Sequence, residues 1–340
     1  MISPFFSVLV LFWKSAQYLP TNLHALNEQT FKDFEVILLD NGAEEPPDPA
    51  VLRQYPSLEL HLLSSRTNLG FAGGNNLAAH QARGEYIVLL NGDAFPEPEW
   101  LATLHQAALD RPGHCFASRL LDANNPDILD GEWNVYHASG LALRKNHKQP
   151  VSLGETKPCH VISACAAASV YPRVAFEQVG GIDEDFFAYM EDVDLDLRLR
   201  LAGYPCLYLP SAIVKHIGSG STGSQSDFAI FYGQRNLIWT FVKNVPGLLF
   251  WLLFPIHVLV NLAYLLISLF MQNRKIIWHA KKEAIRDISK IWNKRQQVQS
   301  MRRITIWQFA RLLNWNPFFP LIKLLSRQYF NWSNNDREPI

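Results

Sequence analysis

The sequence predicts an α/β fold with a mainly parallel, twisted sheet, followed by an α-helical C-terminal region. Three observations support this prediction. Short apolar segments alternate with helix-like segments through the first 120 of the 340 residues, which is typical of a parallel sheet covered on both faces. Several of these apolar segments end abruptly at an Asp or Asn. Residues 247–271 form one long apolar segment that contains no Asp, Glu, Lys or Arg.

The individual elements follow from apolar runs, amphipathic spacing and Gly or Pro breaks. Strands are expected at 7–12, 35–39, 58–63, 86–90 and 161–171. Helices are expected at 21–27, 75–81, 99–110, 172–180 and 190–202. Within the last helix, Asp194 with Arg198 and Asp196 with Arg200 have the i,i+4 spacing of ion pairs, so these two acids are expected to be structural. Residues 122–160 show no regular pattern.

The charge distribution divides the chain into residues 1–240 and 241–340. The first part carries 16 Lys and Arg against 27 Asp and Glu, and the second carries 15 against 4. A basic C-terminal unit beside an acidic domain indicates an anionic binding surface, either lipid or nucleic acid. The four cysteines form no CxxC pair, which suits a reducing compartment. The apolar N-terminus lacks a basic leader, so it is expected to be a buried strand and not a signal peptide.

Two carboxylate clusters are the strongest chemical signals. Asp93 follows the apolar run 86–90, a position at which an acid can hold a divalent cation through oxygen ligands. The segment 191–196 places four acids after the aromatic run 186–189, where a general base can sit in a partly dry pocket. Asp40 also ends a strand and is expected at the same sheet edge. The alternative interpretation makes Asp93 a turn residue and 191–196 a solvated helix face.

Two weaker signals lie in loops. The Gly-rich loop 68–76 lets backbone N–H groups approach a phosphate or a sugar, although a structural turn explains it equally well. It matches neither a dinucleotide fingerprint nor a P-loop. His216 precedes a Gly- and Ser-rich segment, and a functional role for it requires that it lie near Asp93.

Taken together, these segments resemble family 2 glycosyltransferases, in particular the rhamnosyltransferase-like branch. The likeness spans about residues 5–240, and it rests on the order and spacing of the motifs. The segments that carry it are 40–42, 68–76, 89–93, 98–101, 175–187, 191–195 and His216. The resemblance implies a GT-A fold, a nucleotide-diphosphate sugar as donor, and inversion at the anomeric carbon.

The resemblance also implies residue roles. It assigns Asp40 to the nucleotide base, Asp93 and His216 to a Mg²⁺ or Mn²⁺ ion at the donor diphosphate, and Asp192 to proton abstraction from the acceptor. Glu191 is expected to orient the acceptor or to cap its helix. The remaining donor-binding residues are expected to be Asn68, Gly70, Gly73, Asn75, Asn76 and Asn91. Asn91 replaces the first acid of the family's DxD pattern, and the first strand ends in Leu-Phe-Trp, so the nucleotide contacts stay open.

Three alternatives are weighed against this interpretation. A nicotinamide-dependent dehydrogenase would place its Gly-rich loop after the first strand, and here that loop follows the third. A membrane scaffold would not explain the acids at strand ends. A processive polysaccharide synthase should carry QxxRW and several membrane helices, but residues 234–236 do not match and only one long apolar segment is present. We therefore expect transfer of one sugar, with rhamnose favoured, to a lipid-linked saccharide in cell-surface polysaccharide synthesis.

The C-terminal region is expected to bind the cytoplasmic face of the membrane. Residues 247–271 have the length of a membrane-spanning helix, yet a simple span would put the basic block 272–303 on the wrong side. Pro255 instead suggests a bent, re-entrant or in-plane pair of half-helices. The basic block and residues 304–313 would then lie on anionic headgroups. A helical hairpin that closes a soluble dimer is the alternative, so oligomerisation stays open, and no nucleic-acid partner is expected.

Overall fold

The fold is organised around one mixed, largely parallel sheet, seen in a computed structural model that describes residues 3–218 and 226–320. The strand order is β10-β12-β6-β11-β4-β1-β2-β3, and β5 and β7 join at β12 and β6. Strands β1 (Phe6–Phe12), β2 (Phe34–Asn41), β3 (Leu60–Ser65) and β4 (Tyr86–Asn91) are parallel. Their carboxyl ends therefore meet at one edge of the sheet.

The second half of the sheet contains the antiparallel pairings. Strand β11 (Ala168–Pro172) runs antiparallel between β4 and β6 (Cys115–Asp122). The long β12 (Cys206–His216) then runs parallel to β6. The shorter strands are β5 (Ala94–Pro96), β7 (Asn125–Gly131) and β10 (Cys159–Val161). A separate hairpin, β8 (Asn134–Tyr136) with β9 (Ala142–Arg144), lies beside the sheet.

Helices cover both faces of the sheet because successive strand residues point to opposite sides. On one face, α1 (Leu19–Asn27) and α4 (Trp100–Asp110) pack on alternate β1 residues such as Val8 and Val10. On the other, α3 (Gly70–Ala79), α5 (Arg173–Gln178) and α6 (Glu191–Leu201) pack around Leu9. The short α2 (Pro49–Leu52) lies in the β2–β3 connection.

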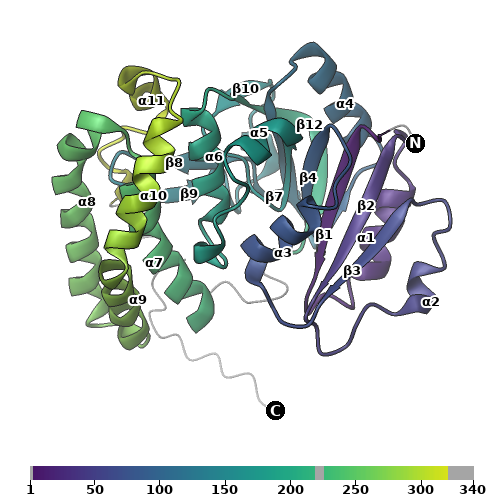
Figure 1. Ribbon diagram of the computed structural model, residues 1–340, viewed down its shortest axis with the longest axis horizontal. Coiled ribbons are helices and arrows are strands. Elements are labelled where there is room, and N and C mark those ends of the chain that lie inside the picture. The colour runs from purple at the N-terminus through teal and green to yellow at the C-terminus, as the bar shows by residue number, and fades with distance from the viewer. Residues whose placement is uncertain (1–2, 219–225, 321–340) are drawn as a thin grey trace.

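Five further helices form a third layer against α6 (Figure 1). They are α7 (Asp227–Asn244), α8 (Gly247–Ser268), α9 (Arg274–Arg286), α10 (Ile288–Ser300) and α11 (Ile306–Leu312). The predicted boundary after residue 240 falls inside α7. Residues of α6, α7, α8, α10 and α11 share one buried apolar cluster, so the two predicted units are joined by a common core.

Most predicted elements of the first 120 residues are present. The helix predicted at 75–81 begins earlier, at Gly70, and the helix after Pro172 begins at Arg173. The single strand predicted at 161–171 is wrong, since Val161 ends β10, residues 164–167 form a loop, and β11 begins only at Ala168. The Asp194–Arg198 ion pair forms, with 2.8 Å between Oδ2 and Nε. The predicted Asp196–Arg200 pair does not form, because the Asp196 carboxylate instead accepts a hydrogen bond from the backbone N–H of Ala164.

The predicted pair of half-helices in 247–271 is also wrong. Gly247–Ser268 form one continuous helix, α8, with Pro255 inside it. Pro255 removes one backbone hydrogen bond, but it lies on the outward side, while Leu249, Phe250 and Leu253 anchor α8 to the body. Within the described residues, α8 is the one helix whose length and mean hydropathy of 2.1 would suit a membrane span, and 17 % of its most apolar window is buried.

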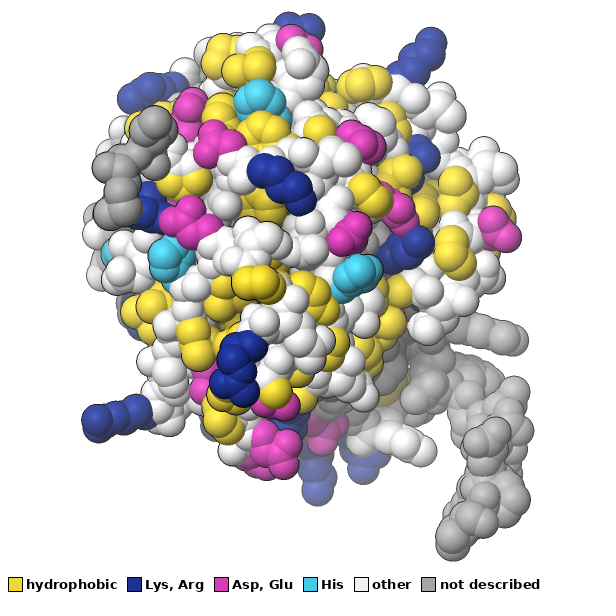
Figure 2. Space-filling model, turned by 90° about the vertical axis from the view of Figure 1, so that its right-hand side faces the viewer, with side chains coloured by type: hydrophobic (Ala, Val, Ile, Leu, Met, Phe, Trp, Pro, Cys, Tyr) yellow, Lys and Arg dark blue, Asp and Glu magenta, His cyan; other side chains and the backbone are white. Residues whose placement is uncertain are grey.

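Part of the basic block 272–303 turns inward. Lys290 and Lys294 form ion pairs with Asp185, and Lys294 also pairs with Asp183. Arg295 is buried and donates to two backbone carbonyls at the end of α7. The two oppositely charged parts of the chain therefore neutralise each other to some extent. On the side of the molecule that carries α2 and β3, acidic, basic and apolar side chains are interspersed (Figure 2).

Candidate active site

A cleft of about 280 Å³ opens at the carboxyl ends of β1, β2 and β4. It brings together residues more than 200 apart in the sequence, from Leu11 to Phe228. This sheet edge is where ligands usually bind in an open parallel sheet. The predicted site residues that line it are Asn68, Gly70, Asn91, Asp93, Glu191, Asp192 and His216. The sheet edge therefore assembles both carboxylate clusters and the predicted histidine around one space.

Asp93, His216 and Asp130 form a chain of contacts on one wall of the cleft. Asp93 lies in the turn between β4 and β5, and its Oδ1 is 3.3 Å from Nε2 of His216. Nδ1 of His216 is 2.7 Å from Oδ2 of Asp130, at the end of β7. All three side chains are buried. The contact between β12 and β5 fixes this geometry, because His216 pairs in register with Ala94.

This chain of contacts affects the charge of His216. Burial disfavours the imidazolium, but hydrogen bonds and the charges of Asp130 and Asp93 outweigh burial and raise the pKa of His216. Burial likewise disfavours the Asp130 carboxylate, but Arg144 and His216 hold the pKa of Asp130 well below its usual range. Asp130 therefore stays ionised and orients the imidazole ring.

The donor set suits a divalent cation. When Nδ1 of His216 donates its hydrogen to Asp130, the lone pair of Nε2 faces Oδ1 of Asp93 at 3.3 Å. Two lone pairs this close repel each other unless a proton or a metal cation lies between them. A histidine whose other nitrogen binds a carboxylate is a common arrangement at metal sites. Asn91 adds an amide, with Nδ2 3.3 Å from Nε2 of His216.

Asp192 also lines the cleft and lies in the first turn of α6. Its Oδ2 accepts hydrogen bonds from Nδ2 of Asn134 at 3.1 Å and from the backbone N–H of Ala166 at 3.4 Å. Its Oδ1 accepts from the N–H of Val193 at 2.7 Å. The carboxylate is half-buried and still lines the cleft, so it is both oriented and accessible.

Glu191, the neighbouring acid, has a different environment. It is buried, and within the described part of the chain its Oε2 has no hydrogen-bond partner. Burial and the charge of Asp192 raise the pKa of Glu191 well above its usual range. Burial thus favours the protonated form of Glu191, whereas hydrogen-bond donors fix the position of the Asp192 carboxylate, so the two adjacent acids are suited to separate roles.

The loop that precedes α6 has an unusual backbone. Phe187, Tyr189 and Met190 all have positive φ angles, of 63°, 64° and 68°. Nδ2 of Asn236, on α7, lies 2.7–2.9 Å from three carbonyl oxygens of this loop. The guanidinium of Arg235 donates to the carbonyls of Asp185 and Phe186, at the start of this loop. These α7 contacts hold the loop that positions Glu191 and Asp192.

The Gly-rich loop closes the cleft from the α3 side. Asn41 holds it, since its Oδ1 accepts from the N–H of Leu69 and its Nδ2 donates to Gly70. Gly70 has φ +73°, and a Cβ there would lie 2.5 Å from the carbonyl oxygen of Phe187, so only glycine lets the two loops meet.

Four predicted donor-binding residues lie outside the cleft lining. Asp40 caps a turn by accepting from the N–H of Ala43. Asn75 donates to a carbonyl inside its own helix, and Asn76 binds Ile182 and Glu184. Gly73 lies within α3 near Glu184. These contacts give the four residues structural positions.

Sequence reasoning missed Asp130, Asn134, Arg144 and Asn236. Asp130 carries the same signal as Asp93, an acid after an apolar pair, but it lies in the irregular segment 122–160. Arg144 lines the cleft and donates to Asp130 at 2.5 Å. Asn236 carried no signal, because its role depends on contacts 47–50 residues away.

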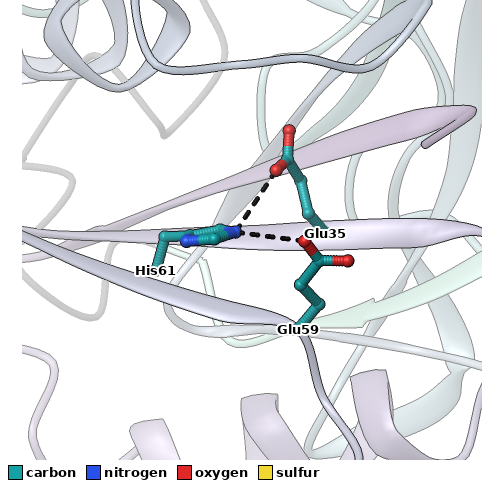
Figure 3. A group of neighbouring side chains, drawn as sticks. All are labelled: Glu35, Glu59 and His61. Carbon is teal, nitrogen blue, oxygen red and sulfur yellow. Dashed lines mark ion pairs between the residues drawn. The ribbon is translucent and has the colours of Figure 1, made fainter. Parts of the chain in front are cut away.

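A different group of side chains has metal-like spacing, but it lies elsewhere. In the described residues, Glu35, Glu59 and His61 approach one another at the amino ends of β2 and β3, away from the cleft (Figure 3). His61 Nε2 is 3.4 Å from Glu35 and 3.5 Å from Glu59. Arg83 already forms ion pairs with both acids, so the group is a neutralised edge cluster.

A sheet of this topology with a cation-compatible wall facing a hydrogen-bonded carboxylate defines a nucleotide-sugar transferase of the GT-A type. Residues 7–180 match the glycosyl transferase family 2 model, and the chain belongs to this family. It is 30% identical over 252 residues to N-acetylglucosaminyl-diphospho-decaprenol L-rhamnosyltransferase of Mycobacterium tuberculosis, covering 64% of this chain and 77% of that protein. It is 31% identical over 215 residues to O-antigen biosynthesis protein RfbC of Myxococcus xanthus, covering 59% of this chain and 16% of that protein.

Solved structures share the fold at low sequence identity. The Staphylococcus aureus TarS 1–349 complex with UDP-GlcNAc has a TM-score of 0.56 and 15% identity, with 90% of each chain covered. The mannosyltransferase PcManGT of Pyrobaculum calidifontis, with GDP-Man and Mn²⁺, has a TM-score of 0.54 and 15% identity over 92% of this chain and 87% of that chain. These likenesses confirm the GT-A-like architecture.

Proposed function

We propose that this chain is an inverting glycosyltransferase that moves one sugar, with L-rhamnose favoured, from a nucleotide diphosphate to a lipid-linked saccharide. The observation that carries this proposal is the cleft itself. One wall offers Asp93 and His216, 3.3 Å apart, to a diphosphate-bound cation, and the other offers the accessible carboxylate of Asp192. A sugar placed between them has its leaving group on one side and its attacking hydroxyl on the other.

On the donor side, Asp93, His216 and Asn91 would hold Mg²⁺ or Mn²⁺ against the diphosphate. When bound, the cation supplies electrostatic stabilisation for the negative charge that develops on the leaving diphosphate. Asp130 keeps His216 oriented by binding its Nδ1. Asn41, Asn68 and Gly70 shape the part of the cleft that would receive the nucleotide.

On the acceptor side, Asp192 removes the proton. The acceptor oxygen forms a bond to the anomeric carbon as the bond from that carbon to the phosphate oxygen breaks, and the acceptor proton passes to a carboxylate oxygen of Asp192. Asn134 and the N–H of Ala166 fix the carboxylate. The protonated Glu191 beside it provides an O–H donor that can orient the acceptor.

The choice of sugar and acceptor draws on the Mycobacterium tuberculosis relative, whose name specifies L-rhamnose and a saccharide on a decaprenyl diphosphate. The corresponding donor for this chain would be deoxythymidine-diphosphate rhamnose. A non-processive reaction in cell-surface polysaccharide synthesis fits this assignment.

The outward face of α8 supports docking at the cytoplasmic membrane surface. One side of the helix packs on the body, and the opposite side exposes a stripe that includes Trp251, Leu259 and Leu266, each 60–65 % exposed. A helix that lies against its own domain, as α8 does in Figure 1, is suited to lie in the interface and not to cross the bilayer. Docking would bring the cleft to acceptors held in the membrane.

The test is a panel of nucleotide sugars given to the full-length purified protein, with and without Mg²⁺ or Mn²⁺. The expected result is metal-dependent release of nucleoside diphosphate, fastest with deoxythymidine-diphosphate rhamnose, and sugar transfer to a lipid-linked N-acetylglucosaminyl diphosphate. Absence of turnover with every nucleotide sugar would overturn the proposal.

A further inference from the structure

A second cavity, of about 840 Å³, adjoins the cleft and is not used by the chemistry described above. The two spaces share a wall, because Arg144 lines both. Neither Asp93 nor His216 lines the second cavity. The cavity thus meets the cleft at Arg144, and none of the predicted site carboxylates lines it.

The β8–β9 hairpin fixes this relation. Arg144 pairs in register with Asn134, whose side chain donates to Asp192. The next residue pair extends the wall outward, since the N–H of Lys145 donates to the carbonyl of Trp133 at 2.7 Å. The hairpin therefore runs from the proposed base directly into the second cavity.

The wall of this cavity is basic within an otherwise acidic half of the chain. It includes Arg144, Lys145 and Lys148, together with two histidines, and no Asp or Glu. Lys148 has one ion pair, with Asp122 at 2.6 Å. Among the residues that the structure describes, no carboxylate lies within ion-pair distance of the Lys145 ammonium group. Lys145 therefore offers the cavity a positive charge without an ion-pair partner among the described residues, whereas Arg144 and Lys148 each already pair with one aspartate.

The turn that presents these lysines is fixed. Asn146 and Lys148 have positive φ angles of 52° and 59°. The side chain of Asn146 donates to the buried Glu132 at 2.6 Å, and His147 binds the backbone carbonyl of Asp130. A positively charged turn held in one conformation loses little entropy when an anion binds.

The far wall of the cavity is apolar and leads to the exposed C-terminal helices. Leu312, Leu313 and Phe319 line it. Beyond them, Trp307 and Trp315 are 76 % and 52 % exposed. Backbone hydrogen bonds between Asn314 and residues 136 and 138 fasten this segment beside β8. Starting from Asp192, the surfaces thus follow in this order: the cleft, the positively charged turn 145–148, and the apolar wall.

We propose that the second cavity binds the diphosphate of an amphiphilic acceptor, with its saccharide in the cleft and its hydrocarbon chain over α11. This inference rests on the proposed function, and it adds the site at which the acceptor diphosphate binds and the residues that bind it. A saccharide linked through a diphosphate to a hydrocarbon chain has the same order of polarity as the three surfaces. Lys145 and Lys148 bind the phosphate oxygens, and Trp133 packs beside the first sugar.

The test measures binding of farnesyl diphosphate to the full-length protein by isothermal titration calorimetry, without donor. Farnesol, inorganic diphosphate and UDP are the comparison ligands. The test variant is Lys145→Gln with Lys148→Gln, and Lys145→Arg keeps the charge. The matched control is Lys32→Gln, an exposed lysine before the amino end of β2.

The double variant should lose about 30-fold or more in affinity for farnesyl diphosphate, since each lost charge-assisted contact is worth about tenfold or more. Lys145→Arg and Lys32→Gln should bind as wild type does, and UDP binding should not change in any variant. Equal binding of farnesyl diphosphate to wild type and double variant would overturn the proposal. Equal binding of farnesyl diphosphate and inorganic diphosphate would overturn the lipid part and leave an anion site.

Donor turnover on the same preparations separates this inference from the proposed function. Intact nucleotide-sugar turnover with unaltered farnesyl diphosphate binding in the double variant would reject the second cavity alone. Absence of turnover with every donor in wild type would reject the proposed function.

Discussion

Replacement of Asn236 by Ala should lower both the stability of the protein and the turnover of the fraction that is folded. The buried Asn236 amide has two hydrogens that serve the carbonyls of Phe186, Ala188 and Tyr189 at 2.7–2.9 Å. Each lost hydrogen bond with its carbonyl left buried costs about 1–2 kcal/mol, so the free energy of unfolding should fall by about 2–4 kcal/mol.

The variant should also lose activity in its folded state, beyond what its lower stability explains. Three residues of this loop hold positive φ angles, a backbone state that surrounding contacts must maintain. Without Asn236 the loop should relax and displace Asp192 from Asn134, and a displacement of about 1 Å can lower turnover by about 10²-fold. Donor affinity should fall less than turnover, because the Gly-rich loop meets this loop at Phe187, whereas β5 and β7 hold Asp93 and His216.

The assay combines urea unfolding, titration with nucleoside diphosphate, and single-sugar transfer at a temperature where the variant is fully folded. Thr240→Ala is the matched control, one turn further along α7, also buried, and bonded only to the carbonyl of Asn236. It should lose stability without losing turnover. Turnover of folded Asn236→Ala within threefold of wild type would refute the positioning role.

Three further predictions follow from the cleft, the core and the surface. Asp93→Asn should lower turnover by at least ~10²-fold. Chelation of the wild type should abolish transfer until Mg²⁺ or Mn²⁺ is restored. Full activity in excess chelator, measured as nucleotide release, would contradict the metal site. Burial lowers the pKa of His257 to about 4; the hydrogen bond that its Nδ1 donates to the carbonyl of Ser139 opposes this shift more weakly, and the charge of Lys281 adds to it. The unfolded chain binds the extra proton between about pH 6.5 and 4, so stability is lost as the pH falls through that range, by about 2 kcal/mol at pH 5. His257→Gln should remove that part of the difference between denaturation at pH 7.5 and pH 5, and an unchanged difference would reject it. Changing Trp251, Leu259 and Leu266 to Gln should shift the full-length protein from the membrane pellet to the supernatant. The same change at three other exposed apolar residues, Leu109, Leu153 and Val174, should not. Equal pelleting of both variants would count against docking through α8.

The parallel half of the fold was predictable because β1, β2 and β4 are buried on both faces and their sequences are nearly continuous apolar runs. Strand β12 was not, since Pro210 and Ser211 lie at a register shift between Leu209 and Ile213 that interrupts its pattern. The apolar run before 168 suggested a longer strand. Its first part instead forms the loop whose N–H groups at Ala164 and Ala166 bind Asp196 and Asp192.

The candidate site divides in the same way. Asp93 and Asp192 could be found because an acid after an apolar run marks the end of a buried element. Asp130 carries the same signal but lies in the irregular segment 122–160, and Arg144 could not be found, because the elements around it meet only in three dimensions. The basic block of the C-terminal region predicted an external anionic partner. In the structure, Lys290 and Lys294 of this block form ion pairs with acids of the same chain.

The most direct test of the account is sugar transfer by Asp192→Asn, compared with Glu191→Gln and wild type. The isosteric change keeps the shape of the side chain, so Asp192→Asn should fold and bind nucleotide sugar as wild type does. Loss of the proton acceptor should lower transfer by about 10²–10⁴-fold, with a smaller effect of Glu191→Gln. Transfer by folded Asp192→Asn at the wild-type rate, or a far larger loss in Glu191→Gln, would contradict the assignment of the base.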